Sequence, residues 1–133
     1  LDVASDGQGR SRKKEHLEDS EYVDAEGEVK VKKGITFNPF LKTKLVGVLG
    51  SSFIKQSPDK CVYRKIYDDY KHRLEHMDAH KEKSKGHRHN MAVRYMVKMF
   101  LVDLYNAWRR IEGLPVAPTY SEAKLGKVHK IAA

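Results

Sequence analysis

The chain has 133 residues, enough for one domain with a single modest core. Lys and Arg number 26 against 18 Asp and Glu, so the formal net charge is +8 at pH 7. This balance favours a polyanionic partner, nucleic acid before an acidic membrane. No apolar stretch approaches the roughly 20 residues that span a bilayer, and no signal-peptide pattern opens the chain. We therefore expect no membrane partner.

The chain opens at Leu1 rather than at methionine, and we expect it to be part of a longer protein. Its single cysteine, Cys61, has no second cysteine to pair with in this chain. A reducing compartment is therefore favoured, and we expect a cytoplasmic location. We interpret Cys61 as a small residue near a helix start rather than as a catalytic thiol.

Residues 1–34 form a charged segment with a predicted hairpin at its end. Residues 10–14 are cationic and residues 15–21 are mainly acidic. With so little apolar surface to offset the entropy of ordering, this part is typical of a flexible segment or of an edge that orders on binding. Valine and lysine then alternate over residues 29–32 after a turn at Gly27, which predicts a short β-hairpin. Two strands alone are marginally stable, so we expect the hairpin to lie on the helices or on another domain.

Residues 35–115 are predicted to form the helical core. Asn38 followed by Pro39 is typical of a helix start, an N-cap with proline at the first helical position. Gly47 and Gly50 interrupt the helix that follows, at a cost of about 1 kcal/mol each against alanine. We expect these glycines to let another backbone approach closely.

Two further helices are expected in this core. A serine–proline start precedes a helix predicted over residues 60–83, whose apolar residues recur at three- and four-residue steps. The longest apolar periodic run covers residues 91–111, with Asn90 as its expected N-cap and Gly113 beyond its end. The predicted fold is therefore mainly α, a three-helix bundle with a small β-hairpin near the N-terminus. Residues 116–133 are expected to form an irregular tail.

Three groups of basic side chains are predicted to contact nucleic-acid phosphates. The group before the longest helix combines positive charge with a glycine and a helix N-terminus, where amide hydrogens favour an anion. An ordinary exposed basic loop is an equally good interpretation of that group. The group on the helix over residues 60–83 would follow a phosphate backbone without reading its sequence. The predicted contacts are Arg10, Arg12, Lys13, Lys60, Arg64, Lys71, Lys85, His87, Arg88 and His89.

Six aromatic side chains at helical spacing have two interpretations. They could stack on bases, as aromatic residues of single-strand-binding proteins do. At this spacing, however, aromatic residues are more often part of a hydrophobic core, and we expect core packing for the whole set. The residues are Tyr63, Tyr67, Tyr70, Tyr95, Tyr105 and Trp108.

Three histidines, His72, His76 and His80, recur every four residues and would share one stripe of a helix. Such spacing can hold zinc, but neither an HExxH motif nor a pair of closely spaced cysteines accompanies it. We interpret the stripe as the solvated side of a charged helix and predict no metal site. A metal-binding helical protein remains as an alternative.

Ser11 is the strongest candidate nucleophile in the chain. It lies between Arg10 and Arg12, whose charges would offset that of a phosphate under attack by the hydroxyl. No general base can be identified beside it.

Several segments, in this order, resemble the C-terminal part of the Piv/MooV-like insertion-sequence transposases, the recombinases guided by a bridge RNA. The match covers most of the chain from about residue 33 to residue 131. The segments that carry it are residues 1–4 (LDVA), 33–45 (KGITFNPFLKTKL), 63–74 (YRKIYDDYKHRL) and 86–109 (GHRHNMAVRYMVKMFLVDLYNAWR).

The resemblance implies a two-part enzyme. A RuvC-like N-terminal domain would hold four acidic metal ligands, with Mg as the expected ion, and the C-terminal part would supply a serine nucleophile. By position the serine would be Ser11, with Ser5 second. The implied partners are DNA, a guide RNA and the RuvC-like domain of the same chain, in a homo-oligomer. The present residues would bind no cofactor and would be inactive without the metal-binding domain.

We therefore expect the C-terminal domain of a DNA transposase that contacts DNA and guide RNA, with Ser11 as its candidate catalytic residue. The alternative is a non-catalytic nucleic-acid-binding or assembly module, in which no serine reacts.

Overall fold

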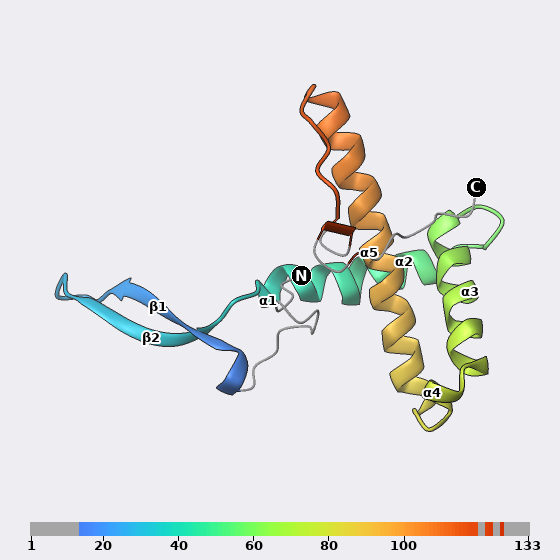
Figure 1. Cartoon of the computed structure of the whole chain (residues 1–133), viewed down its shortest axis with the longest axis horizontal. Helices are drawn as coiled ribbons and strands as arrows, with labels where there is room; N and C mark the ends of the chain where they lie inside the picture. Colours follow the sequence, from blue (N-terminus) through green and yellow to red (C-terminus); the bar gives the residue numbers. More distant parts are fainter. Residues whose placement is uncertain (1–13, 120–121, 124–125, 127–133) are drawn as a thin grey trace. The chain divides into compact units, whose positions relative to one another are not determined.

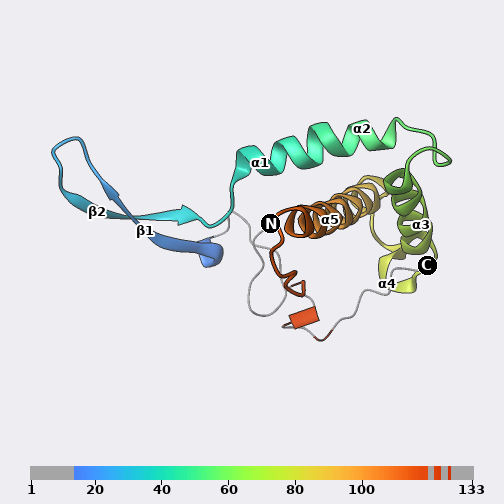
Figure 2. The ribbon, with the colours of Figure 1, turned by 90° about the horizontal axis from the view of Figure 1, so that it is seen from above.

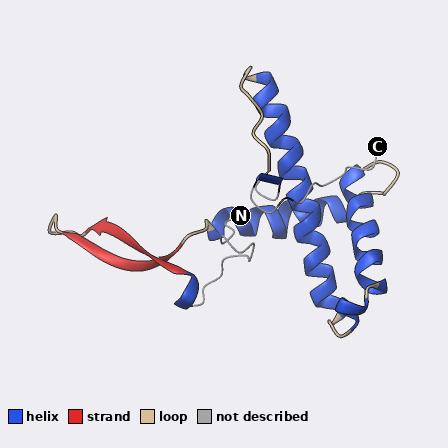
Figure 3. Ribbon diagram, in the orientation of Figure 1, coloured by secondary structure: helices blue, strands red, loops and turns tan. Residues whose placement is uncertain are grey.

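The computed structural model describes residues 14–119, 122–123 and 126. It is mainly helical with a two-stranded hairpin near the N-terminus, which confirms the predicted fold class (Figure 3). The chain divides into two compact units, one of residues Phe40–Pro118 and one of Leu1–Pro39 with Thr119–Ala133. None of the described helices combines the length and apolar character needed to cross a bilayer.

The hairpin consists of β1 (Leu17–Val23) and β2 (Val29–Ile35), preceded by a short 3₁₀ turn, η1 (Lys14–His16). The strands are antiparallel and pair from Leu17 opposite Ile35 to Val23 opposite Val29. β1 begins earlier than the sequence predicts and includes three acidic residues. One of them, Asp19, faces Lys33 across the ladder, and opposite charges at paired positions stabilise a sheet.

The turn between the strands is held by Asp24. Its Oδ1 accepts hydrogen bonds from the backbone amides of Glu26 (3.0 Å) and Glu28 (2.9 Å), and its carboxylate pairs with Lys30. The pairing with Lys30 and these amide bonds lower the pKa of Asp24 from its ordinary 3.8. Gly27 supplies the positive φ, 85°, that the turn needs.

The first helical stretch starts at Pro39, as predicted. It comprises α1 (Pro39–Thr43), a π-helical turn η2 (Lys44–Leu49) and α2 (Gly50–Ile54). In the π turn the amide of Gly50 donates to the carbonyl of Leu45, five residues earlier.

Two other helices complete the bundle, and their bounds differ from the predicted ones. α3 (Val62–His76) stops at Met77, whose extended backbone (φ −86°, ψ 125°) separates it from the single turn α4 (Asp78–Lys81). The predicted helix over residues 60–83 is therefore two helices. α5 (Lys85–Ile111) begins before Asn90, because Ser84 is its N-cap and accepts a hydrogen bond from the amide of His87 at 3.2 Å.

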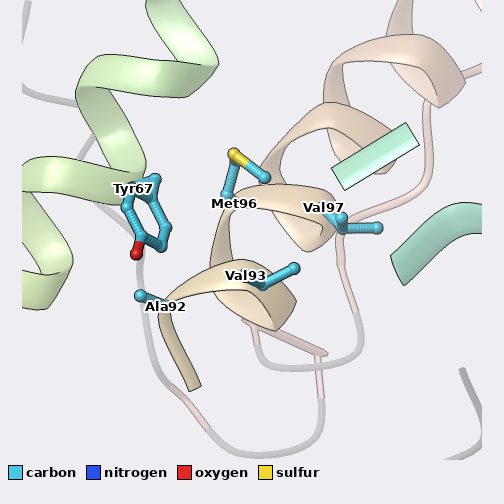
Figure 4. Close-up of a cluster of buried hydrophobic side chains, with 5 residues drawn as sticks. All are labelled: Tyr67, Ala92, Val93, Met96 and Val97. Carbon is cyan, nitrogen blue, oxygen red and sulfur yellow. The ribbon is translucent and has the colours of Figure 1, made fainter. Parts of the chain in front are cut away.

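The core forms where α5 packs on α3 and on the α1–α2 stretch (Figure 2). Figure 4 shows its centre, where Ala92 and Met96 of α5 lie beside the ring of Tyr67 from α3 and Val93 and Val97 point to the other side, toward Gly50 of α2. Met96 and Val97 are completely buried, and Tyr67 is 4% exposed. The central cluster is Tyr67, Ala92, Val93, Met96 and Val97.

Aromatic rings extend this core toward the start of α3. The rings of Phe53, Tyr63 and Phe100 lie with centroids 4.9–5.3 Å apart and join α2, α3 and α5. Tyr63 also donates a hydrogen bond to Oδ2 of Asp103 at 3.0 Å. Burial, together with this hydrogen bond to an anion, raises the pKa of Tyr63 to about 12. The core interpretation therefore holds for Tyr63 and Tyr67.

Gly50 and Gly47 differ in what surrounds them. Gly50 is buried, and a Cβ at this position would lie 3.0 Å from Cγ1 of Val93. A Cβ at Gly47 would meet nothing within 4 Å. The expected close approach therefore applies to Gly50 alone, and what it meets is side chains of α5.

This difference predicts opposite effects of two alanine substitutions. Gly47→Ala should raise the free energy of unfolding by up to about 1 kcal/mol, because alanine favours the helix and meets open space. Gly50→Ala should gain nothing or lower it, because the stiff, buried Val93 must move. Urea denaturation followed by circular dichroism measures both variants. Equal stabilisation by the two substitutions would contradict the packing described.

Candidate nucleic-acid interface

The N-terminal end of α5 borders a hollow of about 530 Å³. Figure 1 shows this end of the helix next to α4. None of the described lining residues is acidic, and their side chains offer hydrogen-bond donors and one permanent cation. The described lining residues are Ser84, Gly86, His87, Asn90 and Arg94.

Helical geometry explains why three of these side chains share the hollow. Once the helix begins at Lys85, His87, Asn90 and Arg94 follow one another at three- and four-residue steps and so lie on one face. The first turn of any α-helix also leaves amide hydrogens without an intrahelical partner. Amide hydrogens, a helix N-terminus and an arginine together suit a phosphate oxygen.

Arg88 and His89 are not among the described residues that line this hollow. The guanidinium of Arg88 donates from Nη1 to the carbonyls of His80 (3.4 Å), Lys81 (3.4 Å) and Lys83 (2.5 Å). It thereby holds the turn after α4 against α5. His89 shares a hydrogen bond of 2.7 Å between its Nδ1 and the hydroxyl of the buried Tyr67. Both predicted contact residues are thus engaged within the protein.

One residue of the predicted basic row Lys60, Arg64 and Lys71 is also bonded within the protein. Arg64 donates from Nε to Asp68 at 2.8 Å and from Nη1 to the carbonyl of Ile54, which ties α3 to the end of α2. Its bond to Asp68 raises the pKa of Arg64. Lys71 places its Nζ 5.8 Å from the centre of the Tyr67 ring, and Lys60 is exposed. Lys60 and Lys71 therefore remain the better placed cations of this row.

The third basic group, Arg10, Arg12 and Lys13, lies outside the described residues, as do Ser11 and Ser5. Their predicted roles stay predictions.

The histidine stripe is divided by the end of α3. His72 and His76 lie on α3 with ring centroids 4.2 Å apart, whereas His80 belongs to α4 beyond the break at Met77. Across the described part of the chain, no group of three or more His, Cys, Asp or Glu side chains could hold a metal ion.

Asn90 and Arg94 are residues of the hollow that our site prediction omits. The predicted helix start at Asn90 leaves His87 and His89 in a loop. With that start, the sequence does not show that His87 shares a helix face with Arg94. Polar residues at positions i, i+3 and i+7 counted from His87 include both Asn90 and Arg94, so this spacing would have indicated them.

No protein-family model, curated protein or solved structure matches the chain.

The neighbours His87 and Arg88 should respond differently to substitution by alanine. Arg88→Ala should lower the free energy of unfolding by about 1.5–3 kcal/mol, because carbonyls now paired with a charged donor lose it. His87→Ala should change it by less than about 0.5 kcal/mol, since this side chain is exposed. Denaturant titration compares the two, and equal losses would contradict the division between a structural and a surface residue.

Proposed function

We propose that this chain is a nucleic-acid-binding domain of a DNA transposase, which contacts DNA and guide RNA through their phosphates. The observation that carries the binding proposal is the hollow at the start of α5, whose described lining includes His87, Asn90 and Arg94 and no acidic residue. The net charge of +8 supports it, because phosphate contacts dominate the affinity of such domains. The likeness of residues 33–131 to bridge-RNA-guided transposases supports the assignment to transposition.

In this proposal the hollow takes one phosphate group of the backbone. The planar guanidinium of Arg94 would donate two hydrogen bonds to phosphate oxygens, and the amides of the first helical turn would donate others. The side chains of Asn90 and His87 add donors from the same face. Lys60 and Lys71 would contact phosphates elsewhere on the strand. Such contacts fix the position of the nucleic acid and read no bases.

Salt dependence tests the binding proposal. The affinity of the chain for duplex DNA or structured RNA should fall steeply as salt rises, because each phosphate contact releases counterions. Arg94→Ala should weaken binding to all sequences alike and make the plot of log K against log salt shallower by about one unit. Lys55→Ala removes the same charge at the end of α2 and serves as the control. Absence of binding at low salt, or affinity that salt does not change, would exclude the proposal.

A catalytic role within this proposal would rest on Ser11. In the complete transposase, with a RuvC-like domain present, Ser11→Ala should abolish strand cleavage and leave nucleic-acid affinity unchanged, because only the attacking hydroxyl is lost. A cleavage assay on labelled DNA measures the first effect, and anisotropy the second. Retained cleavage would favour the alternative, a binding or assembly module whose serine does not react.

A further inference from the structure

The C-terminal end of α5 carries large side chains that are exposed. Figure 1 shows α5 continuing past α2, with the following segment running back along it. Trp108 is 63% exposed and Tyr105 is 41% exposed, whereas Tyr67 in the core is 4% exposed. The core interpretation of the six aromatic residues is therefore wrong for Trp108 and Tyr105.

Tyr105 and Trp108 lie three residues apart, so their rings emerge from neighbouring positions on one side of the helix. Arginines accompany them. The guanidinium carbon of Arg109 lies 5.8 Å from the centre of the Tyr105 ring, and the exposed Arg110 follows. This end of α5 therefore combines aromatic faces with positive charge.

The chain after α5 fixes part of this surface. The amide of Leu114 donates to the carbonyl of Arg109 at 2.8 Å, and Nε of Arg109 donates to the carbonyl of Pro115 at 2.8 Å. The amide of Ala117 donates to the hydroxyl of Tyr105 at 3.4 Å. Tyr105 and Arg109 are thus held before any ligand arrives, which lowers the entropic cost of binding.

We propose that this surface stacks unpaired bases of a single-stranded nucleic acid on Trp108 and Tyr105. Every base has an aromatic face, so such stacking tolerates any sequence, and the adjacent, exposed Arg110 complements the phosphates. The positive charge of the chain and of Arg109 and Arg110 favours this partner over a second copy of the chain, whose surface would carry the same charge. The inference rests on the proposed function and adds single-strand recognition to phosphate binding.

Trp108 is the only tryptophan of the chain, so its fluorescence reports on this surface alone. A short oligothymidine should quench the emission in a saturable manner, and a duplex of equal length should quench it far less. By anisotropy of a labelled oligothymidine, Trp108→Ala should weaken single-strand affinity on the order of tenfold, whereas Trp108→Phe retains most of it. Duplex affinity should stay unchanged in both variants.

Ile111→Ala is the matched control, since Ile111 is 83% exposed on the same end of the helix and has no aromatic face. This substitution should leave single-strand affinity unchanged. An equal loss in Ile111→Ala and Trp108→Ala would overturn stacking in favour of general apolar contact. A dimer in light scattering that Trp108→Ala dissociates would overturn it in favour of a second copy.

The outcomes also separate this inference from the proposed function. Salt-dependent duplex binding without quenching by oligothymidine would overturn stacking and leave phosphate binding in place. Failure to bind either nucleic acid at low salt would overturn both.

Discussion

The packing of the middle of α5 on α2 and α3 is the constraint from which the other features follow. Gly50 brings α2 within van der Waals contact of Val93 and Val97, and Tyr67 closes the cluster from α3. Ala92, Met96 and Val97 are the most deeply buried of the described residues of the helix. Because the contact is central, both ends of α5 extend from it. One end borders the hollow, and the other exposes aromatic side chains.

Helix lengths explain why periodicity alone could not separate core from surface. α5 has 27 residues and is about 40 Å long, whereas α3 has 15 residues and is about 22 Å long. Apolar spacing continues along α5 beyond the point where α3 can cover it. The sequence predicted Tyr67 and Tyr63 correctly as core residues because both lie on the shorter helix. It failed for Tyr105 and Trp108, whose burial depends on what lies opposite them in space.

The start of α5 shows a second limit of sequence reasoning. Ser84 and Asn90 are both good N-caps, and apolar periodicity begins only after Asn90, so the pattern favours the later start. The residues between them include Gly86, a poor helix former, yet they are helical because the Ser84 cap and the bonds of Arg88 hold the first turns. The sequence predicted that a basic helix end lies near residues 85–90. It did not predict that Asn90 and Arg94 share one face of that end, because this follows only from a helix that starts at Lys85.

Charge counted along the sequence overstates the charge that a partner can meet. The guanidinium of Arg88 donates to backbone carbonyls near α4, and that of Arg64 donates to Asp68 and to the end of α2. Both donate to backbone carbonyls at turns, a role that a lysine with its single point charge would fill poorly. Arg94 and Arg110 are exposed on α5. For the nucleic-acid partner that we propose, the relevant quantity is therefore the set of exposed cations, which includes Lys60 as well as these two arginines.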